Sequence, residues 1–294
     1  MIALGRTAAL LAVFAVVACA EAATARGEDR APAAKPAAAC RRADFRVVID
    51  VGHTAAVPGA MSARGVPEYM FNLQLGRDAQ KALLDAGFDK TMLLITSAAP
   101  PLGLFERAFS ANRMKADLFI AVHHDSVPDY LLQTWQYDGH AEHFNDSFPG
   151  YAIFVANGNA DRAGSLAFGR LLGEQLQARG LGYTPHYTLA LMRHRRRELI
   201  DAEAGIYRYD QLVVLKETRM PAVLLEAGSI VNRQEELALA SPERRALESA
   251  AIAAAVAQYC DSRASQRGAL LAKRSPAPKA AARPRRVNAV RFAR

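Results

Sequence analysis

Short apolar segments alternate with longer amphipathic segments through the middle of this 294-residue chain. The segment 45–51 (FRVVIDV) is rich in β-branched residues and runs into Gly52, which is typical of a strand buried on both faces. Five further segments have the same character: 90–95, 117–123, 151–156, 211–215 and 222–225. Since such strands need helices over both faces, the pattern predicts an α/β fold, a single domain with a twisted, mostly parallel central sheet of about six strands and helices on both faces.

The intervening segments carry signals for the start and the end of helices. Pro67 opens a segment with apolar residues at helical spacing, and Gly87 closes it. Further helices are predicted at 104–115, 161–179 and 241–259. The segment 127–150 has no periodicity, which predicts a long loop or insertion, and such loops often carry function.

The first residues of the chain resemble an export signal. Arg6 precedes an apolar stretch that ends in small residues suited to cleavage, so we predict a signal peptide at 1–22 and a periplasmic or cell-wall location. The sequence VVAC at 16–19 also resembles a lipoprotein cleavage motif, so Cys19 is either a lipid attachment site or part of the cleaved signal peptide. The Ala- and Pro-rich segment 23–44 predicts a linker. No apolar run reaches the roughly 18 residues that span a bilayer, which excludes a multi-pass membrane protein.

The charged residues are unevenly distributed along the chain. There are 37 Lys and Arg against 29 Asp and Glu, a net charge of +8, which on its own suggests a nucleic-acid-binding protein. Ten of the basic residues and no acidic residue lie at 262–294, whereas 45–261 is slightly acidic. We therefore predict no nucleic-acid partner and a basic disordered tail at 262–294. The tail either holds the protein near anionic wall or membrane surfaces or is a passive solvated end.

Two cysteines remain once the predicted signal peptide is removed. Cys40 lies just before the first predicted strand, and Cys260 lies at the end of the last predicted helix. Export would allow these residues to form a disulfide that joins the two ends of a domain at 45–261. Two independent thiols are the alternative.

Four polar residues stand at the edges of the predicted elements: His53, Glu68, His123 and Glu226. Three of them follow strands, and sites in α/β sheets gather at the carboxyl ends of strands. Two histidines and a carboxylate form the ligand set of a catalytic zinc, and Glu226 is then free to act as the general acid and base. Each residue also has an ordinary structural explanation, because a glutamate at a helix start is favoured by the helix dipole alone. Without a compact metal motif, the residues by themselves leave both interpretations open.

The short sequence motifs around these residues resemble those of a known family. In order, they are IDVGH at 49–53, Glu68 with Asn72 one turn later, LFIAVH at 118–123 and LKETRMPAVLLEAG at 215–228. Together they closely resemble the zinc-dependent N-acetylmuramoyl-L-alanine amidases of bacterial cell walls, from about residue 45 to residue 260. Arg107 and Asn232 also fit the family pattern.

The resemblance implies an enzyme that hydrolyses the amide between N-acetylmuramic acid and L-alanine in peptidoglycan. It implies one Zn²⁺ held by His53, Glu68 and His123, with Glu226 as the catalytic acid and base. It also implies peptidoglycan as the partner, and whether an activator protein is needed stays open. We predict a monomer. Two other functions stay open as well, a zinc peptidase that cuts the stem peptide and a catalytically inactive wall-binding module.

Several positions near the motifs have less certain roles. Asn72 either orients Glu68, contacts substrate or is a surface residue, and Arg107 is a further candidate for such a contact. His124 follows His123 where the family has a small residue, and we choose His123 as the ligand because neighbouring strand residues point to opposite faces. His124 is the fallback ligand or a residue that contacts substrate.

Two segments outside these motifs also bear on the expected function. The insertion 127–150 is long enough to form a wall of the substrate groove, and we do not expect its His140 and His143 to bind metal. The segment 194–205 lies where some relatives that depend on a partner carry a blocking helix. Its acidic residues Glu198, Asp201 and Glu203 then either occupy the open metal position or belong to a solvated charged helix.

Overall fold

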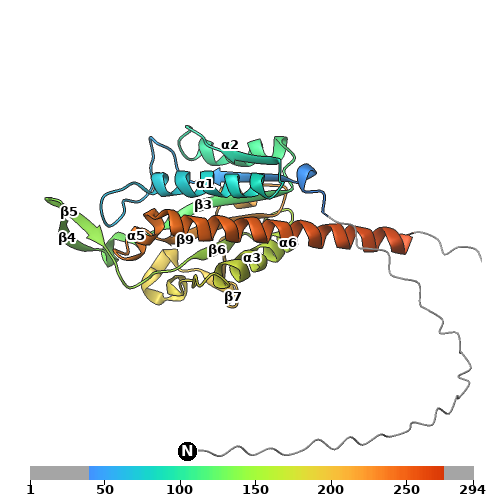
Figure 1. The fold of residues 1–294 in the computed structure, drawn as a ribbon. Helices are drawn as coiled ribbons and strands as arrows, with labels where there is room; N and C mark the ends of the chain where they lie inside the picture. The colour runs from blue at the N-terminus through green and yellow to red at the C-terminus, as the bar shows by residue number, and fades with distance from the viewer. Residues whose placement is uncertain (1–39, 275–294) are drawn as a thin grey trace, which may run out of the picture. The chain divides into compact units, whose positions relative to one another are not determined.

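The computed structural model describes residues 40–274, and its central feature is a seven-stranded sheet (Figure 1). The strand order is β2-β1-β3-β9-β6-β8-β7, and neighbours pair in parallel except at β9–β6 and β8–β7. The strands are β1 (Arg46–Val51), β2 (Lys90–Leu94), β3 (Leu118–Asp125), β6 (Ala152–Val155), β7 (Glu198–Asp201), β8 (Ile206–Arg208) and β9 (Ala222–Ser229). The predicted α/β fold with a mostly parallel sheet is confirmed.

Helices cover both faces of this sheet, as predicted. The helices are α1 (Glu68–Asp85), α2 (Leu102–Arg113), α3 (Arg162–Gln177), α4 (Val213–Lys216), α5 (Glu235–Ala240) and α6 (Pro242–Arg274), and the 3-10 turns are η1 (Arg42–Asp44), η2 (Asp129–Leu131), η3 (His186–Thr188) and η4 (Ala190–Arg195). On one face α1, α3 and α6 bury Leu75, Leu172 and Val256 in one apolar core. On the other face α2 and α4 bury Ala111 and Val214 in a second core. The strands in the middle are therefore covered on both sides, which explains their uninterrupted apolar sequences.

Some predicted elements have a different structure. The segment 211–215 is not a strand, because its apolar residues begin α4, and β7 and β8 were not predicted. The insertion 127–150 is not an unstructured loop, since it contains the hairpin of β4 (Gln133–Tyr137) and β5 (His140–Phe144). Asp138 and Gly139 both have positive φ in its two-residue turn, the pairing that such hairpins favour.

The ends of the domain are also more ordered than predicted. α6 continues to Arg274, so the prediction of a disordered tail is wrong for 262–274, and the end of the predicted linker forms η1. The predicted signal peptide at 1–22 with Cys19, residues 23–39 of the linker and residues 275–294 of the tail lie outside the described residues. Among the helices that the structure describes, none is long and apolar enough to span a bilayer.

A disulfide joins the two ends of the domain. Cys40 and Cys260 are bonded to each other with their Cα atoms 5.4 Å apart, and 220 positions separate them in sequence. The bond ties the segment before β1 to the middle of α6. Such a long covalent loop restricts the unfolded chain and is typical of proteins that fold in an oxidising compartment.

Candidate active site

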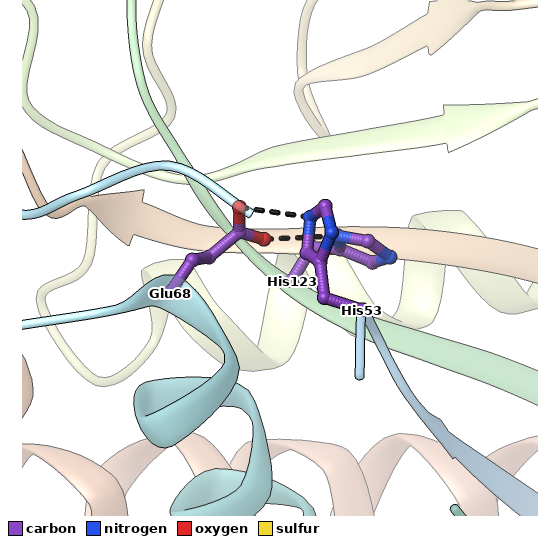
Figure 2. A group of neighbouring side chains, drawn as sticks. All are labelled: His53, Glu68 and His123. Atoms are coloured by element: carbon purple, nitrogen blue, oxygen red, sulfur yellow. Dashed lines mark hydrogen bonds and ion pairs between the residues drawn. The ribbon is translucent and has the colours of Figure 1, made fainter. Parts of the chain in front are cut away.

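Three of the predicted site residues come together at the carboxyl edge of the sheet. His53 follows β1, Glu68 is the first residue of α1, and His123 lies near the end of β3. Figure 2 shows the Glu68 carboxylate facing both imidazoles, with Oε2 2.9 Å from His53 Nε2 and Oε1 3.0 Å from His123 Nδ1. One ligand atom from each residue lies within 4.8 Å of the other two, so the three side chains form a group that can hold a metal ion.

The backbone around this group leaves no space for larger residues. A Cβ atom on Gly52 would lie 2.4 Å from His123 Nε2, and a Cβ atom on Gly59 would lie 2.5 Å from Glu68 Oε2. Gly59 also has a φ of +83°, a conformation that side chains rarely adopt. Two imidazole nitrogens and a carboxylate oxygen, held tightly by three separate elements, are a donor set that fits a transition-metal ion.

Arg107 holds the loop that carries His53. Its side chain is 4% exposed, and its guanidinium donates to Asp50 Oδ1 at 2.6 Å, to the Val51 carbonyl at 2.5 Å and to the His53 carbonyl. Burial raises the pKa of Asp50 to about 6, and the nearby guanidinium opposes that rise. His53 has a φ of 64°, so these contacts fix a conformation that is uncommon for a residue with a side chain. Arg107 thus positions a candidate ligand.

Asn72 and His124 form a hydrogen-bonded chain that holds the Glu68 carboxylate. Asn72 is fully buried, so it is not a surface residue, and its Nδ2 donates to Glu68 Oε1 at 3.1 Å and to the Gly52 carbonyl at 3.3 Å. Its Oδ1 lies 2.7 Å from His124 Nδ1, which acts as the donor in that bond. Burial lowers the pKa of His124 to about 3, so this imidazole is neutral. His124 points toward α1 and does not belong to the metal-binding group.

Glu226 lies beside His123 on the neighbouring strand. The two residues are in register between β3 and β9, and Glu226 Oε2 is a buried atom with no hydrogen-bond partner among the described residues. Burial, followed by the nearby Asp125 and Glu68 carboxylates, raises the pKa of Glu226 well above its ordinary value. A carboxyl group in this environment can hold a proton at neutral pH and release it nearby.

A buried polar network around Asp125, close to Glu226, was not predicted from the sequence. Tyr187 Oη donates to Asp125 Oδ1 at 2.7 Å, and Arg195 Nη2 lies 3.5 Å from the same oxygen and donates to the Ser126 carbonyl at 2.8 Å. Burial raises the pKa of Asp125 to about 7, against the effect of the Tyr187 hydrogen bond. Two features of the sequence could have indicated this network: the polar Asp125 at the end of an apolar strand, and the basic run at 193–197.

The other candidate residues lie elsewhere. His140 and His143 are on the β4–β5 hairpin and are not part of the metal-binding group. The segment 194–205 forms the end of η4 and then β7, so neither a blocking helix nor a solvated helix occurs there. On β7, Glu198 pairs with Arg208 at 2.6 Å and Asp201 pairs with Arg170 at 2.7 Å. Glu203 lies in the turn after β7.

Comparisons with known proteins agree with this arrangement. The chain is 25% identical over 236 residues to the N-acetylmuramoyl-L-alanine amidase AmiC of Neisseria meningitidis serogroup B, a match that covers 76% of this chain and 54% of AmiC. It is 25% identical over 202 residues to an N-acetylmuramoyl-L-alanine amidase of Mycobacterium tuberculosis, covering 68% of this chain and 72% of the relative. The chain thus spans about half the length of AmiC and most of the mycobacterial protein.

Among solved structures, the catalytic domain of CwlV, an N-acetylmuramoyl-L-alanine amidase from Bacillus (Paenibacillus) polymyxa var. colistinus, is similar in fold. The TM-score is 0.53 at 26% identity, and the match covers 74% of this chain and 98% of that domain. A family model described as N-acetylmuramoyl-L-alanine amidase matches residues 47–258, which include the metal-binding group and Glu226. The chain therefore belongs to the N-acetylmuramoyl-L-alanine amidase family.

Proposed function

We propose that this protein is a zinc-dependent N-acetylmuramoyl-L-alanine amidase that acts on peptidoglycan. The observation that carries the proposal is the metal-binding group of His53, Glu68 and His123 with Glu226 directly beside His123. The names of the relatives and of the family support the same activity. The match to nearly all of the CwlV catalytic domain supports the assignment of residues 45–261 as a catalytic domain.

The donor set fits zinc, the ion that the resemblance to the zinc-dependent amidases implies. Two histidines and one glutamate are the three protein ligands of many catalytic zinc sites, where a further position stays open. When bound, Zn²⁺ supplies Lewis-acid polarisation of the substrate carbonyl and favours deprotonation of water. Arg107 and Asn72 act in this site as positioning residues, because they hold the His53 loop and the Glu68 carboxylate.

Glu226 is the residue that moves the proton. Hydrolysis adds water to the lactyl carbonyl carbon and breaks the bond to the L-alanine nitrogen, so one proton must pass from the water to the leaving amine. The Glu226 carboxylate accepts that proton, and because its surroundings raise its pKa it holds the proton until it passes to the nitrogen. The products are a free lactyl carboxylate and a peptide that starts with a free amine.

We further propose that the protein works outside the cytoplasm after export. The Cys40–Cys260 disulfide supports an oxidising compartment. The signal peptide at 1–22 and the periplasmic or wall-associated location follow from the sequence alone. The basic residues of 275–294 would add a salt-sensitive attraction to anionic surfaces if the tail contacts the wall or membrane.

Purified protein incubated with peptidoglycan tests the activity, with the products identified by mass spectrometry. We expect free lactyl carboxylates and free L-alanine amines, loss of these products with a chelator, and recovery with added Zn²⁺. The Glu226→Gln variant should bind zinc with unchanged stoichiometry and lose turnover. Cuts within the stem peptide would indicate a peptidase, and binding without products would indicate an inactive wall-binding module.

A further inference from the structure

The basic run at 193–197 has no role in the proposed chemistry, yet the structure places part of it beside the active site. Arg195 ends η4, and Arg197 lies just before β7. Together with His194 these side chains line a cavity of about 360 Å³, and Glu226 is the acidic residue in its lining. Three basic groups thus surround the space next to the proposed proton carrier.

This cavity adjoins the metal-binding group. Leu212 and Leu224 line it, and the same two residues line a second cavity of about 250 Å³ that contains His53 and His123. Glu226 and His123 are neighbours across β3 and β9. A ligand whose reacting group lies at His123 can therefore reach past Glu226 into the basic cavity.

Arg197 has no acidic partner among the residues that the structure describes. Its guanidinium carbon lies 3.7 Å from the centre of the Tyr209 ring, and Nη1 donates to the carbonyls of His194 and Arg196 at 2.8 and 2.9 Å. Its Nε is buried and has no hydrogen-bond partner in this part of the chain. A guanidinium in a fixed, partly buried position without an anion is suited to bind a planar carboxylate.

The acidic residues nearby are already paired with a different arginine. Arg208 lies 2.6 Å from Glu198 and 3.4 Å from Asp210. Arg195 is partly neutralised by Asp125 below it. The positive charge of Arg197 is therefore left to face the cavity, and a ligand can supply the missing anion.

We infer that this cavity is a subsite for a carboxylate of the stem peptide, with Arg197 as its main partner. The inference rests on the proposed amidase function. Glu226 delivers its proton to the leaving amine, so the peptide that starts at this amine lies on the Glu226 side of the site, where the cavity is. The lactyl carboxyl of the sugar is consumed in the scissile amide, whereas a peptide chain ends in a free carboxylate.

Two matched substrates test the subsite. One is N-acetylmuramoyl-L-alanyl-glutamate, and the other is the same molecule with both free carboxyl groups converted to amides. We expect the wild-type protein to have a kcat/KM about tenfold or more higher for the acid than for the amide, as for one charge-assisted contact. In Arg197→Gln this ratio should fall toward one, mainly through a higher KM for the acid.

Arg208→Gln is the matched control, because Arg208 on β8 is paired with Glu198 and Asp210 and does not line the cavity. It should keep the wild-type ratio. An equal loss for both substrates in Arg197→Gln, or no loss for either, would overturn the subsite while leaving the amidase function intact.

Calorimetric binding of the dipeptide L-alanyl-glutamate and of its diamide separates the subsite from turnover. The wild-type protein should prefer the acid, and Arg197→Gln should lose that preference. If binding shows the preference but neither sugar-linked substrate is cleaved, the subsite stands and the proposed amidase function is wrong. If both compounds bind equally to the wild-type protein, the subsite is refuted.

Discussion

Replacing Glu248 with glutamine tests how the long helix α6 is packed against the sheet. Glu248 is fully buried, and its Oε1 accepts a hydrogen bond from Arg244 Nε at 2.6 Å. Its Oε2 has no partner among the described residues. Burial raises the pKa of Glu248 from 4.5 to about 7, and Arg244 offsets only part of that effect.

The raised pKa fixes the sign and the size of the expected effect. Because the native state favours protonated Glu248, its contribution to stability is fully present below about pH 4.5 and is lost as the pH rises through about 7. At about 1.4 kcal/mol for each unit of pKa, the loss amounts to about 3 kcal/mol. Glutamine does not titrate, so Glu248→Gln should gain about 3 kcal/mol relative to the wild type over this range.

Urea unfolding followed by circular dichroism, repeated across that pH range, measures the free energy of unfolding of both proteins. Glu243→Gln is the control, because Glu243 is exposed on the same helix and should show no such trend. A difference between Glu248→Gln and the wild type that stays constant with pH would refute the argument, since the burial of the carboxylate would then have no energetic consequence.

Three further predictions follow from the site and the disulfide. Gly59→Ala should weaken zinc binding, because its Cβ would meet Glu68 Oε2 at 2.5 Å, and an unchanged affinity in a chelator competition would contradict the tight fit. Asn72→Ala removes a donor to Glu68 and should lower zinc affinity by roughly 10- to 100-fold in the same assay, so wild-type affinity would show that Glu68 needs no such support. Replacing Cys40 and Cys260 with serine should cost up to about 5 kcal/mol of unfolding free energy, and reductant should destabilise the wild type equally but leave the variant unchanged.

The fold was predictable where burial leaves a simple pattern. β1, β3 and β9 are covered on both faces, so each contains a short apolar run that stands out from the helices. The segment 211–215 shows the limit, because a short apolar run fits a strand and a helical turn equally well and only its contacts decide. The helix at 262–274 was missed because the composition of the whole tail outweighed its local run of good helix formers.

The candidate metal ligands could be predicted from the sequence, whereas the roles of the residues that position them could be predicted only in part. His53, Glu68 and His123 stand at or near the ends of elements that the fold brings together, and the resemblance to the amidases singled them out as ligands. The role of Arg107 depends on carbonyl groups more than fifty residues away, and no sequence pattern records which carbonyls a guanidinium reaches. The same holds for the basic run at 193–197, whose charge was evident but whose cavity is formed by distant segments.

The disulfide also has a mechanical consequence for a protein with the proposed action on the cell wall. A pulling force applied between the chain before Cys40 and the chain after Cys260 passes directly through the sulfur–sulfur bond. The 220-position loop between them contains all three candidate ligands and Glu226, and it lies outside that load path. Tension on the two ends of the domain would therefore leave the geometry of the site unstrained for as long as the bond is oxidised.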